Sequence, residues 1–215
     1  MVRTLGWLSV AALAAGLVMA FGVAPREVTQ GNVQRIMYVH VPLIVASYVA
    51  FVVLAVASLV YLIRRDGRAD RLAHASGEVG VMFVGLGIAT GSIWGKPTWG
   101  TWWTWDARLT SVAILFVMYT GYLLLRGTID DPERAARYSA VLGIVAALDI
   151  PLVHFSVYWW RTLHQPPSLM KPGGFTGSTA ILWPLLVNLV AFVVLYAYLA
   201  ARRARLLRAA SEATA

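Results

Sequence analysis

The stretch VPLIVASYVAFVVLAVASLVYLI, residues 41–63, contains no charged side chain. A helix needs about 20 apolar residues to cross a bilayer, so this run predicts a membrane-spanning helix. Further apolar runs lie on both sides of it, at residues 5–23, 79–94, 109–125, 138–160 and 180–201. With 59% hydrophobic and 13% charged residues among 215, the chain is too apolar for one soluble core. The sequence predicts an all-α integral membrane protein, a single domain of six transmembrane helices over residues 1–215.

Arginine and lysine are distributed unevenly between the two sets of predicted loops. Twelve of the 18 fall near the termini, near residues 64–71 and near residues 126–137. Because positive loops tend to stay in the cytoplasm, we expect both termini there, with loops 24–39, about 94–110 and about 161–179 outside. The net charge of +8 then reports membrane topology and requires no nucleic-acid partner. The first run lacks a clear polar cleavage region, so we expect an uncleaved anchor.

Local signals predict where the helices end. Asn32 is a candidate N-cap, which places His40 about two turns into the second helix. Residues 130–133 are typical of a cap and acidic first turn that open the fifth helix. Residues 64–77 are expected to form a polar loop with a solvated His74. Three residues are expected to interrupt regular structure before the fourth helix, namely Gly95, Pro97 and Gly100.

Tryptophan gathers at the predicted outer face. Five of the nine fall in one stretch, namely Trp94, Trp99, Trp102, Trp103 and Trp105. Aromatic belts normally anchor both interfaces, so a one-sided surplus predicts an apolar surface for a large planar ligand. The spacing of Trp99, Trp102 and Trp103 predicts one face of a short helix lying in the interface. The alternative is a plain membrane anchor, for which two indoles suffice.

Three of the four histidines lie on the predicted outer side. His40 and His154 lie at similar depths, about 12 Å and about 9 Å from the outer ends of their helices, and are expected to face each other across a metal. The alternative is that each bonds a neighbouring helix, although polar residues in membranes tend to mark function. His164 defaults to solvated loop surface. Asp149 and Asn188 are expected to serve as interhelical structural residues.

Haem combines these demands in one molecule. It has a flat apolar macrocycle, an iron that accepts axial histidine, and two propionates that pair with cations or N–H donors. The chain has no cysteine, so a thioether-linked haem within it is excluded and a non-covalent b-type haem is expected. The candidate propionate or partner contacts at this level are Arg35, Lys96, Arg108, Arg161 and His164.

The segment WGTWWTWDARLT, residues 99–110, resembles the tryptophan-rich WWD signature of the haem-handling proteins of cytochrome c maturation. Residues 37–42 (MYVHVP) and 154–165 (HFSVYWWRTLHQ) are similar to the histidine segments of the CcmC family, whose size and helix count also fit. The resemblance implies that His40 and His154 are the axial ligands. It also implies that the tryptophan loop, with Asp106 and Arg108, contacts the haem.

The same resemblance implies a delivery function in the bacterial cytoplasmic membrane. Such a protein presents haem on the periplasmic side to the chaperone CcmE, and works with the ABC components CcmA and CcmB and the small membrane protein CcmD. It is an assembly factor more than a turnover enzyme, and any ATP site belongs to a partner. The alternative is a membrane b-type cytochrome that transfers electrons. No histidine pair is present near the inner face, which favours delivery.

Overall fold

The computed structural model describes residues 2–164 and 177–213. Its helices are α1 (Val2–Val18), α2 (Met37–Arg64), α3 (Gly67–Trp99), α4 (Ala107–Thr128), α5 (Pro132–Ala147), α6 (Asp149–Trp159) and α7 (Thr179–Ala213). A π-helical turn, Met19–Val23, extends α1, and a 3-10 turn, Val33–Ile36, precedes α2. Six of the described helical segments are long and apolar enough to cross a membrane. The prediction of a six-helix membrane protein is therefore confirmed.

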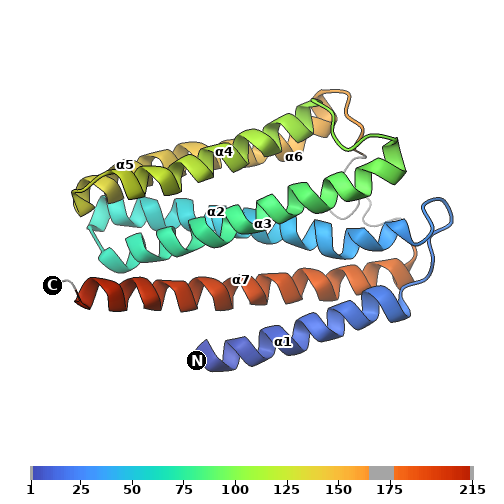
Figure 1. Cartoon of the computed structure of the whole chain (residues 1–215), viewed down its shortest axis with the longest axis horizontal. Coiled ribbons are helices and arrows are strands. Elements are labelled where there is room, and N and C mark those ends of the chain that lie inside the picture. The colour runs from blue at the N-terminus through green and yellow to red at the C-terminus, as the bar shows by residue number, and fades with distance from the viewer. Residues whose placement is uncertain (1, 165–176, 214–215) are drawn as a thin grey trace.

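The helices run side by side along the long axis of the molecule (Figure 1). α2 packs against α3, α5 and α7, while α1 packs along α7 and α4 along α5 and α6. Loops 24–32, 100–106 and 160–164 gather at one end of the bundle, which we call the tryptophan end. The opposite end, formed by residues 64–70, 126–134 and 202–208, is the arginine end. Six crossings bring the two termini toward the arginine end.

Polar side chains join α1 to α7 inside the apolar bundle. The Asn188 side-chain amide donates to the carbonyl of Gly16 at 2.9 Å and to that of Pro184 at 2.7 Å. One amide group thus joins α1 to α7 and also bonds within α7 itself. A Cβ on Gly16 would lie 2.5 Å from the Asn188 side-chain oxygen, so the helices approach too closely for any other residue. The interhelical role expected of Asn188 is confirmed.

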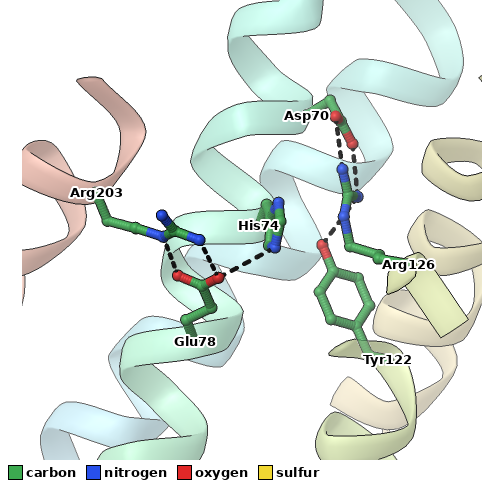
Figure 2. A network of polar contacts seen from close by, with 6 residues as sticks. All are labelled: Asp70, His74, Glu78, Tyr122, Arg126 and Arg203. Carbon is green, nitrogen blue, oxygen red and sulfur yellow. Dashed lines mark hydrogen bonds and ion pairs between the residues drawn. The ribbon is translucent and has the colours of Figure 1, made fainter. Parts of the chain in front are cut away.

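The third helix is much longer than the sequence indicates. It begins at Gly67 instead of residue 79. The prediction of a polar loop over residues 64–77 is therefore wrong, and the loop in the structure has only two residues. Asp66 caps the helix by accepting from the Arg68 amide at 2.8 Å. The charges of this segment are neutralised by distant helices: Asp70 pairs with Arg126 of α4, as Figure 2 shows. Polar residues can therefore remain helical here.

A second pair on the same helix uses Glu78, whose carboxylate accepts two hydrogen bonds from Arg203 of α7 (Figure 2). His74 lies one turn before Glu78, and its Nε2 is 3.2 Å from the Glu78 carboxylate. The expectation of a solvated loop histidine is therefore wrong, because His74 belongs to α3 and is only 23% exposed. These contacts fix the first three turns of α3 between α4 and α7.

The predicted fifth helix is present with a break. It divides at Leu148 into α5 and α6, three residues before Pro151, which cannot donate to the carbonyl of Ala147. Asp131 caps α5 by accepting from the Arg134 amide at 2.9 Å, which confirms the predicted cap at residues 130–133. Asp149 is buried directly after the break, and its Oδ2 has no hydrogen-bond partner among the described residues. The interhelical bond expected of Asp149 is thus not formed by this atom.

Candidate functional site

The tryptophan loop is irregular backbone between α3 and α4. α3 runs through Gly95 and Pro97 to Trp99, and Gly100 ends it in the left-handed conformation at φ 79°. The Thr101 hydroxyl then donates to the carbonyl of Trp103 at 3.0 Å, so a side chain takes over a backbone group that a helix would use. The short interfacial helix expected over residues 99–103 is therefore wrong. The expected break at Gly95 and Pro97 is likewise wrong, since only Gly100 ends the helix.

The five indoles of this region do not form one flat face. Trp102 and Trp105 are exposed, at 58% and 77%, and are free to meet a ligand, a partner or lipid. Trp103 packs edge-on against Trp105 at 5.6 Å, and its own Nε1 is buried without a hydrogen-bond partner among the described residues. Trp94 lies deeper, where its Nε1 donates to Gln30 at 2.8 Å. This region thus offers two exposed rings and three partly buried ones.

Asp106 organises this end of the bundle. Its Oδ1 accepts from the Leu109 amide at 2.9 Å and so caps α4. Its Oδ2 accepts from the Leu163 amide at 3.3 Å and from the Thr104 hydroxyl at 3.3 Å. One carboxylate therefore ties the tryptophan loop to the segment after α6. A shallow hollow of about 320 Å³ lies at this junction and is lined by Thr104, Asp106, Arg161, Thr162 and Leu163.

His40 is held against α3 through one ring nitrogen. Its Nδ1 lies 3.0 Å from the carbonyl oxygen of Gly87 and 3.3 Å from the Thr90 hydroxyl. A carbonyl can only accept, so Nδ1 carries the proton and donates it. The other nitrogen, Nε2, then keeps its lone pair in the neutral ring. Trp94 meets the His40 ring edge-on at 5.8 Å. His40 is therefore oriented as metal-ligating histidines are.

His164 packs against Trp99 and is not fully solvated. Its ring meets Trp99 at 4.7 Å, and its Nδ1 is buried without a hydrogen-bond partner among the described residues. Burial lowers the pKa of the His164 imidazole to about 4, and the positive charge of Arg108 acts in the same direction. Asp106 opposes that shift, while His40 adds to it. His164 is therefore neutral at pH 7, with an available ring nitrogen in electrostatic range of His40.

His154 has different surroundings. It lies on α6, partly buried, with its ring edge-on to Phe155 at 5.0 Å. Arg108 is in electrostatic range of His154 as it is of His40 and His164. Asp106 connects the His164 segment directly to the tryptophan loop, whereas the described contacts of His154 include no bond to that loop. His40 acts electrostatically on His164, and Asp106 ties the His164 segment to the tryptophan loop.

The positively charged side chains proposed as propionate or partner contacts differ in how many hydrogen bonds they already make. The Arg35 guanidinium donates to the carbonyls of Phe21 at 2.6 Å and Ala24 at 3.1 Å, so it fastens the end of the first span. Lys96 donates to the carbonyl of Gly100 at 3.0 Å. Arg161 is exposed in the hollow. Arg108 makes no hydrogen bond or ion pair within the described part of the chain, and residues 165–176 of the loop 161–179 lie outside it.

Sequence reasoning missed four residues around His40. Gly87, Thr90 and Gly91 lie on one face of α3 against the ring, and Gln30 holds Trp94. The three residues of α3 have a sequence signal: they follow the spacing i, i+3, i+4 from Gly87, with Trp94 at i+7, which marks one face of a helix. That pattern is readable in the sequence, but only the structure shows that it faces His40.

These observations define a multi-pass membrane protein with an imidazole, indole and cation site at one end. The chain belongs to the CcmC family: the family model described as Heme exporter protein C matches residues 1–215. It is 46% identical over 211 residues to Heme exporter protein C of Bradyrhizobium diazoefficiens, covering 96% of this chain and 80% of that one. The protein of the same name from Escherichia coli is 37% identical over 202 residues, 93% of this chain and 81% of its own.

A plant protein is also similar. An Arabidopsis thaliana protein whose name refers to cytochrome c biosynthesis and a ccmC-like mitochondrial protein is 37% identical over 201 residues. The match covers 94% of this chain and 75% of the plant protein. The relatives thus align along nearly the whole chain, so the site described above lies within the shared region.

Proposed function

We propose that this protein binds haem non-covalently at the tryptophan end and hands it to a partner. The observation that carries the proposal is the pair of neutral imidazoles, His40 and His164, each with an available ring nitrogen, beneath the tryptophan loop. When bound, haem would supply an iron that takes two nitrogen ligands within a flat apolar ring. The residues fit that group: imidazoles for the iron, indoles for the ring, and for a propionate Arg108, which makes no ion pair within the described ranges.

The second axial ligand has two candidates. The family resemblance favours His154, while His164 is favoured by its buried Nδ1, which has no partner among the described residues, and by the electrostatic influence of His40 on its ring. We propose His40 with His164. His164 also lies in a segment that is hydrogen-bonded to the tryptophan loop through Asp106 and packs on Trp99, so a partner that displaces this segment can remove one ligand. This is the property that a protein needs if it releases its haem.

We propose that the tryptophan end faces the periplasm of a bacterium and that both termini lie in the cytoplasm. Twelve of 18 positive residues lie toward the arginine end, which supports this orientation. Because the chain has no cysteine, single cysteines can report it. Val28→Cys, at a side chain 99% exposed, should react with a membrane-impermeant thiol reagent in spheroplasts, whereas Asp130→Cys should react only after lysis. The reverse labelling pattern would overturn the orientation.

The proposed partners follow from family membership. We propose a periplasmic haem chaperone of the CcmE type as recipient, with CcmA and CcmB supplying ATP hydrolysis and CcmD as a small membrane subunit. Haem at one end alone suits delivery better than electron transfer across the membrane. At the arginine end, His74 is already bonded to Glu78. A transmembrane cytochrome b would need a second haem near that end.

The test is haem content and transfer. Detergent-purified protein should show a b-type absorption spectrum, and alkaline solvent should extract the haem. Adding the soluble chaperone domain should deplete this haem and yield a chaperone–haem adduct, with partner ATPase activity needed only for release of the adduct. Haem that stays bound while it cycles between ferric and ferrous with a quinol would instead establish the cytochrome alternative.

A further inference from the structure

One face of α3 forms a seat for the His40 ring. Gly87, Thr90 and Gly91 contact the imidazole, and Trp94 lies one turn further along the same face. The four positions follow the spacing i, i+3, i+4 and i+7, so all of them point toward α2. His40 itself lies two residues before Pro42 on α2. The position of the His40 ring is thus set mainly by residues of the neighbouring helix, α3.

Hydrogen bonding at this seat selects one form of the ring. The Thr90 hydroxyl donates to the carbonyl of Leu86 at 2.8 Å, so toward His40 it can only accept. Gly87 offers a carbonyl, which also only accepts. Both groups therefore require a proton on Nδ1 of His40. The lone pair is left on Nε2, the nitrogen turned away from the two acceptors.

Glycine at 91 determines where the ring lies. A Cβ at this position would come within 2.9 Å of the His40 Cε1 and 3.3 Å of its Nδ1. Real Cβ contacts are almost never that short, so any side chain at 91 must push the ring away from α3. Gly87 has a related role, because a Cβ there would lie 2.4 Å from the Ile44 side chain. Two glycines one turn apart thus let α2 and α3 approach at the level of His40.

We propose that Gly87, Thr90 and Gly91 form a positioning site that fixes the tautomer and the place of His40 and thereby sets how firmly haem is held; this rests on the proposed haem binding. A carbonyl that accepts from the distal N–H of a ligating imidazole orients the ring and increases its basicity. Loss of such outer partners weakens metal affinity roughly 10- to 100-fold. None of these three residues touches the haem in this scheme.

The matched variants are Gly91→Ala and Gly121→Ala. Both replace a helical glycine by alanine, but a Cβ at 121 meets nothing within 4 Å. Gly91→Ala should weaken binding of added haemin roughly 10- to 100-fold, and Gly121→Ala should leave it unchanged. Thr90→Val should weaken haemin binding less, since the Gly87 carbonyl still accepts from His40 Nδ1. Thr90→Ser keeps the hydroxyl and should bind haemin like the wild type. Equal affinities for Gly91→Ala and Gly121→Ala would overturn the proposal.

A haem-free measurement separates this proposal from the proposed function. Nitrogen-15 NMR of histidine-labelled protein, with His40 assigned by its loss in His40→Asn, should report a neutral ring protonated on Nδ1. Thr90→Val should shift that signal, and Thr90→Ser should not. A ring protonated on Nε2 in the wild type contradicts the seat even if haem binds. Should haemin fail to bind the wild type, the proposed function fails, while the NMR result still decides the seat.

Imidazole rescue covers the case in which Gly91→Ala folds poorly. His40→Gly removes the ligand, and free imidazole should restore haemin binding if the α3 seat accepts a detached ring. The double variant His40→Gly, Gly91→Leu fills the seat and should not be rescued. Rescue of both variants to the same extent would show that α3 does not position the ring. Size-exclusion profiles identify which preparations are folded.

Discussion

The two ends of the bundle differ in how their buried charged groups and ring nitrogens are paired, although the hydroxyls of Ser58 and Ser139 toward the arginine end also have no partner among the described residues. At the arginine end, Arg126 makes two hydrogen bonds to Asp70, at 2.7 and 2.8 Å, and Arg203 engages Glu78 in the same fashion (Figure 2). At the tryptophan end, several buried polar atoms have no partner among the described residues, namely Gln34 Oε1, Arg35 Nε, Tyr38 OH, Trp103 Nε1 and His164 Nδ1.

This difference indicates that one end of the bundle stabilises the fold and the other end binds a ligand or partner. An unpaired buried polar group costs about 1–3 kcal/mol, so a fold that leaves several together at one end must recover that energy elsewhere. The arginine end consists of charge pairs that hold α3 to α4 and α7. The tryptophan end holds ring nitrogens and N–H groups that a ligand or partner can satisfy. We therefore expect mutations at the arginine end to change stability and mutations at the tryptophan end to change binding.

The largest effect on stability should come from Asp70→Ala. The Arg126 side chain is only 12% exposed, so the variant leaves a mostly buried cation without its partner. Breaking such a pair costs about 3–5 kcal/mol. Denaturant unfolding in detergent should show a loss of this order, while the folded fraction keeps the wild-type haem spectrum. Arg208→Ala, in an exposed pair with Glu212, is the control and should unfold like the wild type. A haem spectrum altered by Asp70→Ala would contradict the separation of roles.

Asp106→Ala should have a smaller effect on stability and a strong effect on haem. Loss of a helix cap costs about 1 kcal/mol, and the same variant releases Leu163 and with it the His164 segment. Asp131→Ala is the matched control, because Asp131 caps α5 through an equivalent 2.9 Å bond. Thermal unfolding should respond alike in both variants, and haem affinity should fall only in Asp106→Ala. Equal affinities in the two variants would mean that Asp106 merely caps its helix.

The smallest effect on stability should follow from replacing Trp102, Trp103 and Trp105 together by alanine. Two of these rings are more than half exposed, so the bundle loses little packing. Aromatic contacts with a ligand contribute about 0.5–1.5 kcal/mol each, so the triple change should abolish haem transfer while single changes remain mild. A chaperone-transfer assay measures this. If the triple variant transfers haem like the wild type, these tryptophans serve only to anchor the loop at the membrane interface.

Much of the fold was predictable because helix length and apolarity are local properties. Residues 41–63 lie wholly within α2, and the cap at residues 130–133 is where it was expected. The first turns of α3 were missed because their charges are paired with Arg126 and Arg203, which are distant in the sequence. A hydropathy pattern registers a charged residue but not the distant residue that pairs with it. The same limit applies to the tryptophan loop, where the helical spacing was misleading because Gly100 ends the helix.

The site was predictable in composition and less so in geometry. The sequence singled out His40, but it took His164 to be solvated, because nothing local indicates that Asp106 binds the Leu163 amide 57 residues away. It also offered Arg35 as a propionate or partner contact, which stays a prediction, and it did not show that the Arg35 guanidinium fastens the end of the first span. Contacts between segments far apart in the chain decided each of these points.

The most direct test of the account compares His40→Ala, His164→Ala and His154→Ala in one spectroscopic series. We expect the first two variants to lose most haem or to change from bis-histidine to five-coordinate or water-ligated spectra, and added imidazole to restore the wild-type bands. His154→Ala should keep the wild-type spectrum and haem content. Loss of the bis-histidine spectrum in His154→Ala, with a wild-type spectrum in His164→Ala, would contradict the ligand pair proposed here. Unchanged spectra in all three would contradict haem binding at the tryptophan end altogether.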